Sequence, residues 1–209
     1  MMRSVRALGI VLFALALSGC SQNLVQVRES SAGAGESLAL KRVAVAPFRN
    51  VPRTGAAALR TDATSLIASY IAEGLAARGL DVVPASDVAQ SISAGDAARD
   101  LRSELALAKD QFGADALVTG TVYRFRDRSG EAMGTLSPAS VGFDVKIYRA
   151  PDGKLLWSGT FDHTQVALGE NALTAAQYPG GGTRWLTSEE LARFGALKVT
   201  KEVPLQQAE

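Results

Sequence analysis

An α/β fold, with one mixed β-sheet and helices packed on it, is predicted by three observations in this 209-residue chain. The segment 43–48 is apolar throughout, which is typical of a central strand covered on both faces. The segment 59–75 repeats its apolar residues at helical spacing. The segments 116–126 and 141–148 have period two, as half-buried antiparallel strands do. These patterns together favour a single sheet covered by helices.

The expected order is β-α-β-α-α-β-β-β-α. Gly79 and Gly113 each follow a helical segment and are typical C-terminal stops. Pro47 has no amide proton and should end the first strand. The expected elements are strand 43–48, helix 59–75, strand 80–84, helix 86–92, a helix opening at Asp96 and running to about 112, strands 116–126, 141–148 and 155–162, and a helix that stops before Pro204.

The last helix has a start signal in its sequence. Thr187 and Glu190 have the spacing of a capping box, and Leu186 stands at the position of the staple residue. The preceding run, Gly180 to Gly182, follows no clear strand and precedes no Lys-Ser or Lys-Thr pair. We therefore interpret it as a flexible hinge and not as a phosphate loop.

The first twenty residues have the pattern of a secretory signal. Arg3 and Arg6 precede an apolar run over 7–17, and two small residues lead to Cys20, the only cysteine in the chain. A cysteine at this point resembles a bacterial lipobox, so residues 1–19 are expected to be a lipoprotein signal peptide. The resemblance implies cleavage before Cys20, a diacylglyceryl group on its sulfur and a third acyl chain on its new amine.

A transmembrane helix is the weaker interpretation of this segment, because a span needs about 20 apolar residues and the run has roughly half that number. Several acyl chains give stable anchoring where one would not. Ser21, in place of Asp, follows the cysteine, which resembles the sorting signal for the outer membrane. We expect a protein anchored by lipid on the periplasmic side of the outer membrane.

Composition limits what the mature chain can bind. Removal of the signal leaves 20 basic and 21 acidic residues, so no positive footprint for nucleic acid remains. No second cysteine is present to form an intramolecular disulfide.

Residues 20–40, with the small residues of 30–35, are expected to form a flexible tether. Residues 41–209 should form a single domain, less regular from about residue 169.

Four residues are candidates for partner binding. Arg124, Arg126 and Arg128 alternate along one strand, as a basic stripe for an anionic partner would. A solvated sheet face or a charge-guarded edge explains the same pattern. Trp185, beside the glycine run, either anchors a partner or covers the helix that follows it. Strict alternation would place the first two arginines on the side of Val122, opposite Phe125.

Catalytic chemistry is not predicted. His163 is the only histidine. Its neighbour Asp162 should point to the other face of the strand, so the two do not form a dyad. A metal site would need further convergent ligands, and no His or Cys partner is present. We expect no catalytic residue, no metal and no cofactor.

Two segments carry a family resemblance: 42–48, which reads RVAVAPF and precedes a long helix, and 112–122, which reads FGADALVTGTV. They resemble the α/β domains of the curli-secretion lipoprotein CsgG, of LpoB, the outer-membrane activator of penicillin-binding protein, and of the TolB N-terminal domain. The resemblance covers roughly residues 41–165.

The resemblance implies a non-catalytic binding or scaffolding module for an envelope protein or assembly, related to cell-wall synthesis or secretion. The alternative is a self-assembling structural subunit of an export or surface-organelle complex, which would make the chain a homo-oligomer. An enzyme is a third class, and the absence of a convergent polar constellation argues against it.

Overall fold

The computed structural model describes residues 24–30, 37–51, 59–94 and 100–206. A seven-stranded mixed sheet runs in the order β1-β9-β8-β5-β2-β4, and β3 also pairs with β5. The elements are β1 (Val25–Ser30), β2 (Arg42–Val45), β3 (Arg49–Asn50), α1 (Ala63–Ala76), β4 (Asp81–Val83), α2 (Ala85–Ala94), α3 (Leu101–Asp110), β5 (Ala116–Arg126), β6 (Ser129–Gly130), β7 (Thr135–Ser137), β8 (Ser140–Arg149), β9 (Leu155–Thr164), α4 (Ala172–Ala175), the 3-10 turn η1 (Pro179–Gly182) and α5 (Ser188–Glu202). The predicted fold class is confirmed, and the nine predicted elements occur in the predicted order.

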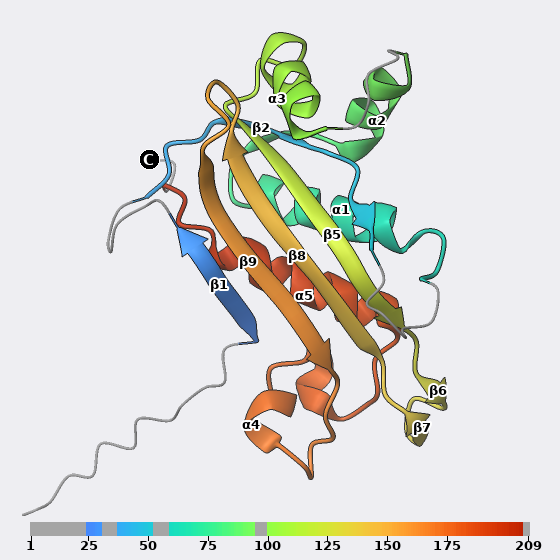
Figure 1. Cartoon of the computed structure of the whole chain (residues 1–209). Helices are drawn as coiled ribbons and strands as arrows, with labels where there is room; N and C mark the ends of the chain where they lie inside the picture. The colour runs from blue at the N-terminus through green and yellow to red at the C-terminus, as the bar shows by residue number, and fades with distance from the viewer. Residues whose placement is uncertain (1–23, 31–36, 52–58, 95–99, 207–209) are drawn as a thin grey trace, which may run out of the picture.

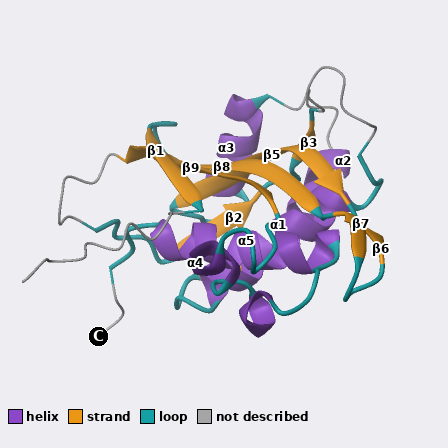
Figure 2. Ribbon diagram, turned by 90° about the horizontal axis from the view of Figure 1, so that it is seen from below, coloured by secondary structure: helices purple, strands orange, loops and turns teal. Residues whose placement is uncertain are grey.

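Helices α1 and α5 cover one face of the sheet, which we call the covered face (Figure 2). The main core lies between them and the strands. Its largest fully buried side chains from the sheet are Trp157, Phe143 and Phe161. Ile67 of α1 and Leu191 of α5 are also fully buried there. Burial of large apolar side chains of this kind is the dominant stabilising term for the domain.

Strand β2 lies between β5 and β4 and is parallel to both. Val43 and Val45 belong to the main core, whereas Ala44 and Ala46 face the other way into a smaller core. Helices α2 and α3 build that second core over the β2–β4 end of the sheet. The apolar run without polar alternation is thereby explained, and the predicted two-sided burial of this strand is confirmed.

The predicted helix signals are confirmed in the two long helices. Gly79, three residues after α1, has a φ of 88°, a conformation that favours glycine. At the start of α5, the Thr187 hydroxyl accepts from the Glu190 N–H at 3.2 Å. The Glu190 carboxylate accepts from the Thr187 N–H at 2.9 Å, which completes the capping box. Leu186 is fully buried beside it.

Three expectations need correction. Residues 25–30 lie in the predicted tether, yet they form strand β1, because Val25 is buried against the core and the strand pairs antiparallel with β9. Helix α3 begins at Leu101, where the Asp100 side chain accepts from the Ser103 N–H at 2.7 Å. The predicted start at Asp96, like the predicted lipidation site Cys20, lies outside the described residues.

The third correction concerns strand β5. Its register with β8 shifts between Val122 and Arg124, so Tyr123 forms a β-bulge. The extra residue reverses the alternation, and Phe125 therefore shares the core side with Val122. Arg124 points to the opposite side, where it meets Asp162. Strict alternation placed these side chains wrongly because it allowed no bulge.

Candidate docking surface

The second face of strands β1, β9, β8 and β5 carries no helix over β9 and β8 in the described part of the chain (Figure 1). We call it the open face. Its side chains are polar or charged and come from four neighbouring strands. They include Arg28, Tyr123, Arg124, Asp144, Lys146, Ser158, Thr160 and Asp162. Adjacent antiparallel strands hold these groups about 5 Å apart in a fixed array.

A hollow of about 270 Å³ lies in the open face between β1 and β5. Arg28, Tyr123 and Lys146 line it together with Asp144 and Thr160. The Arg28 Nε donates to the Thr160 hydroxyl at 3.0 Å, which fixes the guanidinium over the strand. The hollow therefore presents two cations beside one carboxylate, while the hydroxyl-bearing Tyr123, Ser158 and Thr160 in its lining are buried.

A smaller hollow of about 120 Å³ continues the open face toward α3, and Asp144 and Lys146 line both. Glu104 of α3 is 2% exposed there, and its Oε1 lies 3.5 Å from the Arg49 guanidinium. A buried carboxylate needs a compensating charge, because desolvation penalises the ionised form. The ion pair thus joins helix α3 to strand β3 at the border of the open face.

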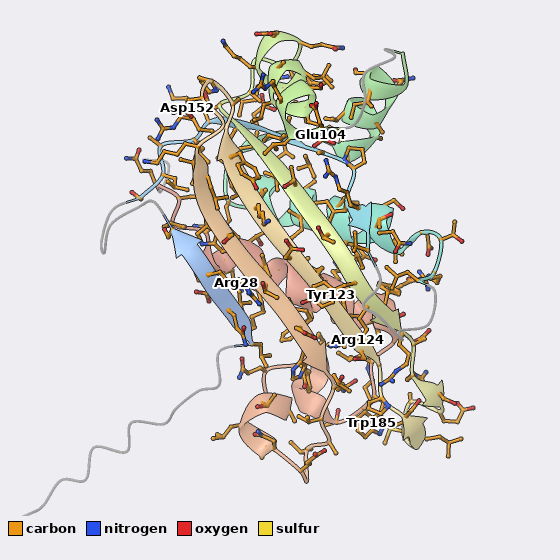
Figure 3. All side chains as sticks on the ribbon, viewed as in Figure 1. Arg28, Glu104, Tyr123, Arg124, Asp152 and Trp185 are labelled. Atoms are coloured by element: carbon orange, nitrogen blue, oxygen red, sulfur yellow. The ribbon has the colours of Figure 1, made fainter. Side chains whose placement is uncertain are left out.

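Gly142 shapes the open face by lacking a side chain. A Cβ at this position would lie 2.4 Å from Cε2 of Tyr123, so the tyrosine ring occupies the space above the neighbouring strand. Figure 3 shows Tyr123 and Arg124 on adjacent positions of β5, on the side of the sheet that faces the viewer. The bulge at Tyr123 is what brings both side chains to this side.

The predicted arginine stripe is present in part. Arg124 forms an ion pair with Asp162, and each of these side chains is 28% exposed. Arg126 is exposed two residues further along the same face. Arg128 lies beyond the end of β5, and its guanidinium donates to the Gly130 carbonyl at 2.6 Å. Arg124 and Arg128 thus make internal bonds, and Arg126 is the more accessible member of the stripe.

Trp185 lies at one end of the sheet and not on the open face (Figure 3). Its backbone N–H donates to the Ala132 carbonyl at 2.8 Å, which attaches the segment before α5 to the β6–β7 hairpin. The half-buried indole lines a hollow of about 210 Å³ with Met133 and Leu168. The preceding run forms the turn η1, in which Gly180, Gly181 and Gly182 all have positive φ.

His163 has a structural partner. Its Nε2 is hydrogen-bonded to the Tyr178 hydroxyl, and that oxygen also accepts from the Val166 N–H at 3.2 Å. Burial lowers the pKa of His163, and the nearby Arg124 charge adds to this, while Asp162 opposes it. A hydroxyl that donates to Nε2 satisfies both groups when the imidazole is neutral. The histidine therefore fastens the segment after β9 to the end of the sheet.

Among residues 24–30, 37–51, 59–94 and 100–206, no group of three or more His, Cys, Asp or Glu side chains is placed to hold a metal ion. Within the same ranges, no helix is both long enough and apolar enough to cross a bilayer.

Sequence reasoning missed most of the open face. Arg28 was expected in a tether, where no strand partner could be assigned to it. From the sequence alone, Asp144 and Lys146 were predicted only to lie on the solvated side of a half-buried strand. The alternation of Gly142, Asp144 and Lys146 was the available signal, because polar or small residues at every second position of a strand mark a face that no helix covers.

No family model and no curated protein matches this chain. Solved structures do match. The PelC dodecamer from Paraburkholderia phytofirmans has 20% identity and a TM-score of 0.53, over 88% of this chain and 99% of that one. Lipoprotein GNA1162 from Neisseria meningitidis has 21% identity and a TM-score of 0.45, over 60% and 83%. The LpoB C-terminal domain from Escherichia coli has 14% identity and a TM-score of 0.40, over 61% and 86%. Over 88% of its length, the chain therefore shares its fold with PelC.

Proposed function

We propose that this protein is a non-catalytic docking module of the cell envelope, anchored through Cys20 on the periplasmic side of the outer membrane. The open face is the observation that carries the proposal. It is a rigid array of charged and hydroxyl-bearing side chains, left uncovered by the helices that pack on the rest of the sheet. The partner is an envelope protein or assembly of cell-wall synthesis or secretion.

The chemistry of this face suits a protein surface better than a small apolar ligand. Small-molecule sites are typically about 300–1,000 Å³ and mostly apolar. The hollow here is about 270 Å³, and Arg28, Asp144 and Lys146 are among its lining residues. Charges of both signs fix orientation and exclude wrong partners. Lipid anchoring raises the local concentration of the domain near its partner, so a face of modest affinity is sufficient.

A second candidate is a subunit that assembles with copies of itself. It is favoured by one comparison, because PelC, whose fold this chain shares, forms a dodecamer. In that case the open face or the edge strand β1 contacts a neighbouring protomer. The two candidates predict different crosslinks from the same position.

Photocrosslinking in intact cells separates the two candidates. A photoreactive amino acid replaces Lys146 on the open face, and the matched control places it at Lys201, which is exposed on α5. A single heterologous product from position 146, absent from position 201, supports the docking module. A ladder of self-crosslinks from position 146 supports the assembling subunit. Equal products from both positions would remove the open face from either role.

A further inference from the structure

We infer that the end of the domain formed by the β6–β7 hairpin and the segment from Leu168 to α4 rests on the lipid surface. We call this the apolar end. The inference rests on the proposed lipid anchor at Cys20, and it assigns an orientation to the whole domain. It is carried by three observations: where exposed apolar side chains gather, where β1 begins, and how much chain separates β1 from the anchor.

Exposed apolar side chains concentrate at the apolar end. Six large apolar side chains are exposed in the described part of the chain, and four of them are here. Met133 and Leu136, in the hairpin, are 81% and 89% exposed. Leu173 of α4 is 70% exposed, and Leu168 is 44% exposed. Exposed apolar side chains gathered at one end of a domain mark a surface that contacts a membrane or another protein.

The topology brings these segments to one end of the sheet. The β6–β7 hairpin joins the end of β5 to the start of β8, and α4 follows the end of β9. Arg126 pairs with Ser140, and Ser140 pairs with Thr164, so these three strand ends lie side by side. Figure 1 shows both the hairpin and α4 at the lower end of the sheet, on either side of it.

Strand β1 begins near the same end. It is antiparallel to β9, and Val25 pairs with Phe161, three residues before the end of β9. At about 3.3 Å per residue, Val25 lies roughly 10 Å from the level of Thr164 and about 20 Å from the level of Leu155 at the other end of β9.

The anchor cannot lie far from this end. Four peptide units join Cys20 to Leu24. A fully extended chain of that length spans at most about 14 Å. An acylated Cys20 therefore holds the start of β1 close to the bilayer, and the apolar end, which carries four of the six exposed large apolar side chains, is the end of the sheet nearer to it. The open face then stands roughly perpendicular to the membrane.

The apolar end has no excess of basic side chains. Its basic side chains include Arg126, Arg128 and Arg184, and its acidic ones include Asp127, Glu131, Glu170 and Glu190, which pairs with Arg184. Attraction to anionic lipid needs an excess of basic side chains near the surface. Contact with the bilayer should accordingly depend on the apolar side chains and change little with the proportion of anionic lipid.

A fluorescent probe on an engineered cysteine tests the orientation. The acylated full-length protein carries Met133→Cys or Leu173→Cys, each labelled with an environment-sensitive dye, and the control is Asp152→Cys at the opposite end. The vesicles contain phosphatidylethanolamine and phosphatidylcholine with a nitroxide-labelled lipid. Quenching by nitroxide should be at least about two-fold stronger at 133 and 173 than at 152, because interfacial burial reaches some 5–10 Å into the bilayer.

Each other outcome overturns the inference for a distinct reason. Equal, weak quenching at all three sites in vesicles that co-float with the protein would show that the anchor holds but the apolar end faces water. Protection from aqueous iodide without nitroxide quenching would show that protein covers this end. Failure of the wild-type protein to float with vesicles would remove the anchor itself. None of these results bears on crosslinks from Lys146, so the docking proposal is judged separately.

Discussion

Gly74 of α1 lies so close to Thr200 of α5 that a Cβ on the glycine would be 2.4 Å from the threonine Oγ1. The two helices pack against each other over the covered face, and both residues are buried. The absence of a side chain at Gly74 therefore sets the separation of the helix layer. Packed interiors cannot absorb an added methyl group without moving neighbouring atoms.

Gly74→Ala should destabilise the domain by about 1–3 kcal/mol, because the new methyl group overlaps Thr200. Urea unfolding of the soluble domain measures this free energy. The double variant Gly74→Ala/Thr200→Ala should recover most of the loss, since it removes the overlapping hydroxyl. Gly134→Ala is the matched control, because no atom lies within 4 Å of its Cβ and its φ is not positive. An additive double variant would contradict the contact.

Glu190 should make unfolding pH-dependent in the acid range. Its hydrogen bonds to the Arg184 guanidinium, at 2.7 and 2.8 Å, lower the pKa of the carboxyl to about 2, and the Thr187 N–H contributes to the same shift. A lowered pKa gives stability that is present above the ordinary value of 4.5 and lost as pH falls through about 2. The melting temperature of Glu190→Gln should therefore be lower than that of wild type at pH 7, and the two melting temperatures should converge near pH 2. A difference independent of pH would contradict the ion pair.

His163 should titrate below the ordinary range, because burial lowers its pKa. Since the unfolded chain then binds a proton more readily than the folded one, stability should fall as pH drops below about 6.5. The chain has one histidine, so its imidazole signals in an NMR titration need no assignment. His163→Phe keeps the ring contacts with Phe161 and Tyr178 and should flatten the stability profile between pH 5 and 7. A midpoint at or above 6.5 would contradict the burial argument.

Cys20→Ala should leave an unprocessed precursor or a soluble protein, because the acylated sulfur is the proposed attachment to the membrane. Fractionation of cells that express the variant measures this, with Ser21→Ala as the control that keeps the thiol. Normal recovery of processed Cys20→Ala in the outer-membrane fraction would contradict the anchor.

Local sequence signals predicted the regular elements well where packing agrees with them. The run 43–48 is apolar on both sides because β2 is covered on both sides. The Thr187–Glu190 box predicted the start of α5 because both of its hydrogen bonds are made within one turn. Such signals need no information about distant parts of the chain.

The rest depended on contacts between distant segments. Strand β1 has a short, mixed pattern, and only pairing with β9, more than a hundred residues later, makes it a strand. The bulge at Tyr123 reverses the sides of Arg124 and Phe125, and no residue at that position announces it. The open face was only partly predictable: the polar alternation along β8 indicated it, but the strands that extend it are set by the sheet order.

The pairing of β1 with β9 has a mechanical consequence. The hydrogen bonds of antiparallel strands run perpendicular to the strand axis. A force that draws the domain away from a membrane held through the N-terminal side of β1 acts along that axis and loads the bonds of the strand together, in shear. A force that peeled the same strand from one end would instead load its hydrogen bonds one after another. The short strand nearest the anchor therefore shares the tension among all of its hydrogen bonds to β9.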